Sequence, residues 1–108
     1  MDEVAEFLAK AEQQRQAILE VQQRIERMEV TGRSRNSVVV AKVRGSGQLT
    51  EVTLDARQLP RYDAKVLGGF VVEAVNDAMA RLAEASREAF APFIAEAEEA
   101  AEAAEALP

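Results

Sequence analysis

The side chains that most often perform acid–base or metal chemistry are missing from this chain. Its 108 residues include no cysteine and no histidine. This absence excludes thiol nucleophiles, disulfides and imidazole general bases, and it removes the ligands that zinc, copper and iron sites usually need. We therefore expect no catalytic residues, no metal and no cofactor, and we predict that the protein is not an enzyme.

Two other patterns resemble chemical motifs only in part. Gly45-Ser46-Gly47 lacks the Lys-Ser/Thr pair and the helix start that a phosphate-binding P-loop requires, so a chain reversal is the better interpretation. Carboxylates are plentiful towards the C-terminus, where the pattern is typical of a solvated acidic surface. They are Glu96, Glu98, Glu99, Glu102 and Glu105. No pocket signature accompanies them, so an acid–base pair is not predicted.

Charge is distributed unevenly along the chain, although the net charge is only −6. Residues 31–67 hold seven basic and three acidic side chains. Residues 1–30 hold four basic and seven acidic ones, and residues 68–108 hold two and nine. A protein that coats nucleic acid is usually basic overall. The acidic flanks therefore keep protein binding open as an alternative to nucleic-acid binding.

The basic side chains are the candidates for contacts with nucleic-acid phosphates, which require Lys and Arg at spaced positions on a protruding surface. We predict such contacts for six residues: Lys10, Arg15, Arg24, Arg33, Arg35 and Arg44. None has a clear base-reading role, so the binding would be electrostatic and largely independent of sequence. The alternative is ordinary solubilising charge, with Arg24 and Arg27 paired to nearby acids.

Residues 3–29 have the apolar spacing of one long helix. Apolar side chains recur three and four residues apart, which is the a/d seam of a coiled coil. The seam contains Val4, Phe7, Ala11, Ile18, Val21, Ile25 and Met28, with Gln14 as its single polar member. A helix of about 27 residues is about 40 Å long, and a domain this small cannot cover all of it. The seam therefore predicts contact with a second helix and favours an oligomer.

The middle of the chain predicts a three-stranded antiparallel meander. Residues 29–32 leave the helix and begin a strand, and the polar residues 33–37 are predicted to form a hairpin loop. The valine-rich segment 37–44 and the alternating segment 49–54 are the next two strands. Because a small sheet is unstable alone, we expect a helix or a second sheet to cover it.

A second long helix is predicted from Ala64 to about Phe90, with Asp63 as its N-cap. Its apolar stripe adds three candidates for the helix seam: Val71, Val75 and Leu82. Gly68-Gly69 costs about 1 kcal/mol per glycine relative to alanine. The glycine pair therefore predicts either a close backbone approach or a later start of the helix.

Pro92 interrupts the apolar pattern of this second helix. The Ala/Glu-rich segment that follows crowds like-charged side chains, so we expect it to fray if it is helical. We accordingly divide the chain into one domain at 1–91 and an acidic tail at 92–108.

The start of the chain is acidic and amphipathic, without the basic and apolar regions of a signal peptide, and no segment is predicted to span a membrane. The lack of cysteine fits a reducing compartment. We expect a cytoplasmic location.

Three segments are specific in their order. The first helix exits through Met28-Glu29-Val30-Thr31-Gly32, a strand reads Glu51-Val52-Thr53-Leu54-Asp55, and the second helix contains Asn76-Asp77-Ala78. In this order they resemble the YbaB/EbfC family of bacterial nucleoid-associated proteins, over a stretch from about Ala11 to Arg87.

The resemblance implies an α+β fold of order α-β-β-β-α, with long helices projecting from a sheeted body, and a homodimer. It also implies binding to double-stranded DNA with little sequence preference, a nucleoid location, and effects on nucleoid organisation and gene expression. The family has no catalytic residues to carry over. The acidic composition leaves one alternative open, a dimeric protein-binding adaptor or secretion-chaperone-like protein whose helices offer apolar grooves to a partner segment.

Overall fold

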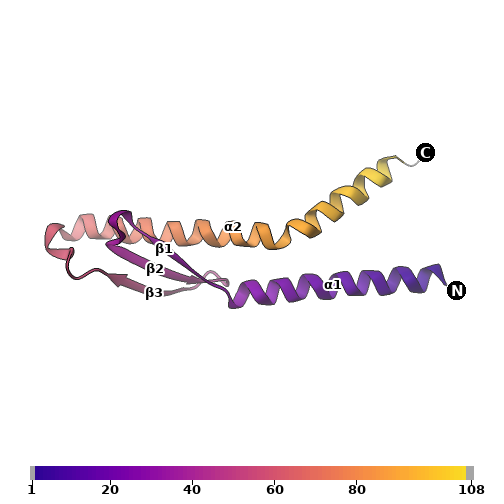
Figure 1. The fold of residues 1–108 in the computed structure, drawn as a ribbon, viewed down its shortest axis with the longest axis horizontal. Helices are drawn as coiled ribbons and strands as arrows, with labels where there is room; N and C mark the ends of the chain where they lie inside the picture. The colour runs from indigo at the N-terminus through magenta and orange to yellow at the C-terminus, as the bar shows by residue number, and fades with distance from the viewer. Residues whose placement is uncertain (1, 107–108) are drawn as a thin grey trace.

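The chain forms two long helices joined by a small sheet. The computed structural model describes residues 2–106. The elements, in order, are α1 (Glu3–Arg27), β1 (Glu29–Arg33), η1 (Arg35–Ser37), β2 (Val39–Arg44), β3 (Leu49–Leu54), η2 (Leu59–Arg61) and α2 (Ala64–Glu105). Figure 1 shows the sheet at one end, beside the first half of α2, and α1 with the second half of α2 at the other. The predicted α-β-β-β-α order is confirmed.

The molecule is elongated. Its extents are 73 × 27 × 15 Å and its radius of gyration is 21.3 Å, whereas a compact domain of this length has a radius of gyration of about 13 Å. Much of the surface of both helices therefore lies outside any intramolecular core.

Helix α1 begins at a side-chain cap and loses exposure along its length. The carboxylate of Asp2 accepts a hydrogen bond from the Val4 amide, which satisfies one of the free amides at the helix start. Val4 and Phe7 in the first turns are 65% and 70% exposed, whereas Ile25 in the last turn is 7% exposed. The predicted seam is thus open at its start, half-buried at Ile18 and Val21 where α1 runs beside α2, and buried at Ile25.

The sheet is antiparallel with strand order β1-β2-β3. Glu29 pairs with Arg44 and Arg33 pairs with Val40, so β1 is one residue longer than predicted and Arg33 is a strand residue. The connection that follows is a short 3₁₀ turn in which Asn36 and Ser37 adopt positive φ angles of 58° and 51°. The predicted chain reversal at Gly45-Ser46-Gly47 is confirmed, with φ of 91° at Gly47.

The core lies between the sheet and the first half of α2, which packs across β1 and β2. Val38, Val39 and Ala41 are fully buried against Phe70 and Ala74. Tyr62 packs edge-on against Phe70, with ring centroids 4.9 Å apart. Two of the predicted seam residues, Val71 and Val75, pack against this core from the same chain.

One glycine determines how closely the sheet approaches α2. A Cβ atom on Gly32 would overlap the backbone at Ala74 and Ala78, so no larger residue fits between strand and helix. Both alternatives predicted for Gly68-Gly69, a close backbone approach and a later start of the helix, are wrong. Nothing lies within 4 Å of a Cβ built on either residue, and the helix starts at Ala64 with Asp63 as its cap.

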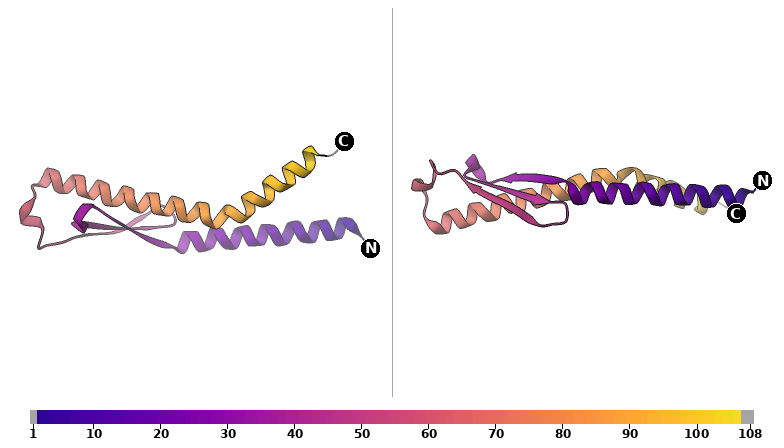
Figure 2. Two further views of the ribbon diagram at one scale, coloured as in Figure 1. Left: turned by 45° about the horizontal axis from the view of Figure 1, so that its top comes forward. Right: turned by 90° about the horizontal axis from the view of Figure 1, so that it is seen from below.

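Helix α2 continues through Pro92 to Glu105, so the helix end predicted near Phe90 is wrong. Proline cannot donate the amide hydrogen bond to the preceding turn, and such positions bend a helix without necessarily ending it. Figures 1 and 2 show α2 bending away from α1 in its orange-to-yellow part. We call the two diverging segments, residues 3–17 of α1 and 93–105 of α2, the fork.

Within residues 2–106, no helix is long and apolar enough to cross a membrane.

Candidate nucleic-acid interface

The strand registers separate the sheet into two faces. Val39, Ala41 and Val43 are buried on the face that packs against α2. Because strand side chains alternate, the residues between them point to the opposite side. We call that side the outer sheet face. Its polar members are Glu29, Thr31, Arg33, Lys42, Arg44, Glu51 and Thr53.

The outer sheet face carries three cations and two carboxylates. Lys42 pairs with Glu51 across β2 and β3, with 3.5 Å between the ammonium nitrogen and the carboxylate oxygen. Arg33 and Arg44 are exposed and form no ion pair within 4.0 Å among the described residues. They lie at opposite ends of the β1–β2 ladder, about 13 Å apart along the strands. These two guanidinium groups are therefore available to ligand phosphates.

The segment that carries Arg33 and Arg35 is fixed to α2 by two carboxylates. Asp77 accepts a hydrogen bond from the Arg33 amide at 2.9 Å, and Glu73 forms an ion pair with the Arg35 guanidinium at 2.9 Å. The Arg33 amide and then Arg81 lower the pKa of Asp77, and the Arg35 side chain lowers the pKa of Glu73. The charge of Arg35 is thus largely offset within the chain.

The other predicted contacts lie on α1. Arg24 is exposed in the last turn of the helix, next to the sheet. Lys10 and Arg15 lie farther along α1, and Arg15 is paired with Glu12 at 2.8 Å. The six predicted residues therefore do not form one patch. Four of them lie on or beside the sheet: Arg24, Arg33, Arg35 and Arg44. The other two, Lys10 and Arg15, lie on the α1 segment of the fork.

Sequence reasoning left Lys42 out of the predicted set, although the alternation of its strand places it with Arg33 and Arg44. Its pairing with Glu51 depends on the β2–β3 register, which shifts between Lys42 and Val43 because β3 carries one extra residue there. No local signal in the sequence marks that shift.

The residues that carry the family resemblance have structural roles at this site. Gly32 allows the close approach to Ala78, and Asp77 holds the Arg33 amide. Asp55 accepts hydrogen bonds from the Arg57 amide and the Gln58 side chain, and so fixes the turn after β3. Gly32 and Asp77 thus hold β1 on α2, which orients the outer sheet face, whereas Asp55 fixes the connection that leads from β3 towards α2.

Comparison with known proteins identifies the family of this chain. The model of the YbaB/EbfC DNA-binding family matches residues 1–97. The chain belongs to the YbaB/EbfC family. Among its relatives, a nucleoid-associated protein from Nocardia farcinica is 30% identical over 91 residues, which are 84% of this chain and 83% of the relative. A nucleoid-associated protein from Corynebacterium kroppenstedtii is 31% identical over 88 residues, 82% of this chain and 88% of that one.

A solved structure shares the YbaB/EbfC-like fold at lower sequence identity. The uncharacterized protein HP0035 from Helicobacter pylori matches with a TM-score of 0.56 and 17% identity, over 72% of this chain and 90% of the other. At that identity the likeness concerns the fold alone.

Proposed function

We propose that this protein is a dimeric nucleoid-associated protein of the bacterial cytoplasm that binds double-stranded DNA largely without sequence specificity and so affects nucleoid organisation and gene expression. The observation that supports this most directly is the outer sheet face, on which Arg33 and Arg44 are exposed and free of ion pairs among residues 2–106. Membership of a DNA-binding family supports the same function. Phosphate contacts supply the affinity, and Arg24 at the edge of the sheet extends the basic surface.

The geometry narrows the predicted set of DNA contacts. Arg33, Arg44 and Arg24 are the main phosphate contacts in this proposal, and Arg35 contributes less because Glu73 offsets its charge. Lys10 and Arg15 contribute least, because they lie among the carboxylates of the arm. None of these side chains is assigned a base-reading role, which agrees with weak sequence preference.

DNA binding is tested by fluorescence anisotropy with a labelled mixed-sequence duplex at several salt concentrations. We expect log K to fall linearly with log salt, by about 0.9 for each phosphate contact. Arg33→Glu and Arg44→Glu should each weaken binding and make this slope shallower. Arg87→Glu, which makes the same charge change at a residue paired with Glu84 on α2, is the matched control. Absence of binding at ~50 mM salt, or equal losses in all three variants, would contradict the proposal.

The dimer is proposed on the strength of an uncovered apolar surface. Leu49, Val52 and Leu54 lie on the same sheet face as the buried core, because Val52 pairs with Ala41 and Leu54 with Val39. Helix α2 covers only β1 and β2, however, and these three side chains are 43%, 36% and 39% exposed. β3 is also an edge strand, which other chains readily approach. A second copy on this surface would form a symmetric dimer and present the outer sheet face twice.

Neighbouring positions on β3 provide a test of the dimer. Val52→Lys places a charge on the apolar face and should convert the dimer to a monomer in sedimentation equilibrium. Thr53→Lys makes the same addition on the outer sheet face and should leave the dimer intact. A monomeric wild-type chain, or dissociation by both variants, would exclude this interface.

A further inference from the structure

Three basic side chains outside the predicted set of DNA contacts gather at one end of the molecule. They are Arg57, Arg61 and Lys65, on the segment that leads from β3 through η2 into α2. Figure 1 shows this segment, residues 55–65, at the end opposite the two termini, and we call it the tip. All three side chains are exposed, and that of Arg57 is 94% exposed. A protruding group of spaced cations is typical of a surface that binds phosphates.

The two carboxylates of the tip already have partners within the chain. Asp55 accepts hydrogen bonds from the Arg57 amide at 3.1 Å and from the Gln58 side chain at 2.9 Å. Asp63 caps α2 by accepting a hydrogen bond from the Val66 amide at 2.9 Å. The acidic side chains of the tip therefore fix its backbone and do not pair closely with its cations.

The cations of the tip have little to do with the stability of the fold. The Arg57 guanidinium lies 3.8 Å from Asp55, in an exposed pair of a kind that contributes little. Arg61 and Lys65 form no ion pair within 4.0 Å in the described part of the chain. Lys65 also lies in the first turn of α2, where a cation opposes the helix dipole. These side chains are therefore available to a ligand.

Hydrogen bonds hold the tip beside the end of β1 that carries Arg33. The Asp55 amide donates to the Val38 carbonyl at 2.8 Å, and the Gln58 side chain donates to the Asn36 carbonyl at 3.1 Å. Both acceptors belong to η1 or to its C-cap, which follow β1 in the chain. The tip cations therefore continue the basic surface of the sheet past Arg33 to the end of the molecule.

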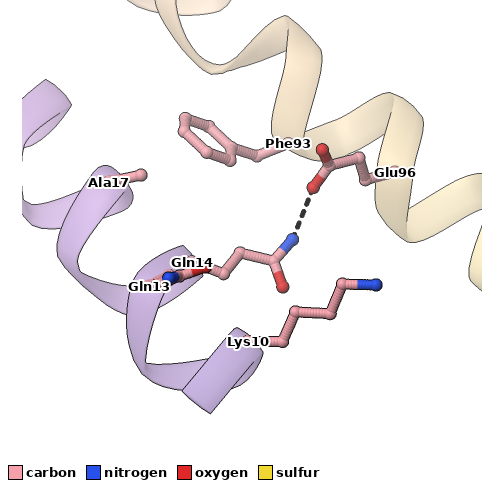
Figure 3. A pocket seen from close by; sticks show the side chains of 6 residues that line it. All are labelled: Lys10, Gln13, Gln14, Ala17, Phe93 and Glu96. Atoms are coloured by element: carbon pink, nitrogen blue, oxygen red, sulfur yellow. Dashed lines mark hydrogen bonds between the residues drawn. The ribbon is translucent and has the colours of Figure 1, made fainter. Parts of the chain in front are cut away.

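The balance of charge differs between the tip and the fork. The tip holds three cations and two carboxylates, whereas the two segments of the fork hold two cations and eight carboxylates. At the fork, Lys10 lines a hollow of about 500 Å³ together with Glu96, which accepts a hydrogen bond from Gln14 (Figure 3). A phosphate that approaches the tip therefore meets less opposing charge than one that approaches Lys10.

We propose that the tip is a further contact with DNA phosphates, in which Arg57, Arg61 and Lys65 extend the basic surface of the sheet along the bound duplex. This inference rests on the proposed DNA binding and assigns it a site that the sequence did not indicate. Spaced cations on a protruding segment suit a polyanion, whose charges repeat along its length, better than a single small anion. The tip adds to the contacts made by cations on the arms and replaces none of them.

The test uses the full chain and a labelled mixed-sequence duplex in fluorescence anisotropy at several salt concentrations. Arg61→Gln and Lys65→Gln should each weaken binding by roughly fivefold at ~0.1 M salt and make the slope of log K against log salt shallower by about 0.9. Arg61→Lys keeps the charge and should bind as the wild type does. Arg87→Gln removes the same charge from a residue paired with Glu84 and should change neither affinity nor slope.

The outcomes separate the tip from DNA binding as a whole. A wild-type chain that does not bind the duplex contradicts the proposed function and the tip site together. Wild-type binding that Arg61→Gln and Lys65→Gln leave unchanged, or that Arg87→Gln weakens equally, overturns the tip site alone. Sedimentation equilibrium without DNA should give both tip variants the wild-type mass. A lower mass in these variants would identify another copy of the chain as the occupant of the tip and so overturn the proposal.

Discussion

At the sheet end of this molecule Val38, Val39 and Ala41 are fully buried, whereas at the fork Val4, Phe7 and Leu8 each remain at least 60% exposed. Both ends are built from aliphatic and phenylalanine side chains in regular elements. The difference is topological, because α2 lies across the strands near its start and bends away from α1 in its orange-to-yellow part (Figure 2). Apolar composition alone therefore does not identify a core. The same residue types stabilise the fold at one end and are available to a partner at the other.

The largest expected effect comes from removing one phenylalanine at each end. Phe70→Ala should lower the free energy of unfolding by about 3–5 kcal/mol, because it leaves a cavity beside Tyr62 and Ala74. Phe7→Ala should change it by no more than about 0.5 kcal/mol, because that ring is already mostly in water. Urea denaturation followed by circular dichroism measures both. Similar losses in the two variants would show that the arm is part of the folding core.

Substitution of two glycines should change the stability by an intermediate amount and in opposite directions. Gly32→Ala should destabilise the fold by about 3 kcal/mol or more, because the added methyl group overlaps the α2 backbone at Ala74 and Ala78. Gly68→Ala should raise the stability by about 1 kcal/mol, since the position is an open helix interior where alanine is preferred.

Thermal melts of the two glycine variants, recorded at one protein concentration, test these opposite signs. A neutral Gly32→Ala would mean that strand and helix separate easily. A destabilising Gly68→Ala would reveal a contact at that position.

The smallest expected effect is a change in the stability of the fold at low pH. The folded-state pKa values of Asp77 and Glu73 lie below their ordinary values of 3.8 and 4.5. Both carboxylates therefore stabilise the fold above those values, and the contribution is lost as the pH falls through the lower folded values. The double variant Glu73→Gln with Asp77→Asn should be less stable at neutral pH and lose less stability between pH 5 and 3.

Melting temperature measured against pH tests this prediction. Asn76→Ala, which alters an exposed and non-titrating neighbour, is the control and should keep the wild-type acid response. An unchanged acid response in the double variant would show that these two carboxylates do not couple η1 and β1 to α2.

The element order and, to within two residues, the strand bounds followed from the sequence because alternation, valine content and glycine turns are local signals. The valine-rich strand was predicted from residue 37 but begins at Val39, because Ser37 belongs to η1. The continuation of α2 through Pro92 did not, because a proline removes one hydrogen bond while the flanking alanines and glutamates still favour helix. A close backbone approach was predicted at Gly68-Gly69, yet the close approaches are at Gly32, against Ala78, and at Gly45, against Ile25. Only these three-dimensional contacts explain the two glycines.

The sequence placed the candidate DNA-binding residues on helices, strands or loops, but it did not show which of them are free of ion pairs. Arg33 and Arg35 look equivalent in the sequence, yet Glu73 pairs with only one of them, and Glu73 is 38 residues away along the chain. Likewise, the covered and open halves of the α1 seam have the same spacing. Contacts between residues far apart in the sequence determine which arginine is paired and which part of the seam is covered. Heptad and charge patterns carry no information about such contacts.

The slenderness of the molecule affects how its mass is measured. A radius of gyration of 21.3 Å in a chain of 11.8 kDa equals that of a compact protein of about 390 residues. Friction with solvent rises accordingly, so a single copy leaves a sizing column well ahead of globular standards of its own mass. Elution volume would thus overstate the number of copies, and the assembly state is properly read from mass, by light scattering or sedimentation equilibrium.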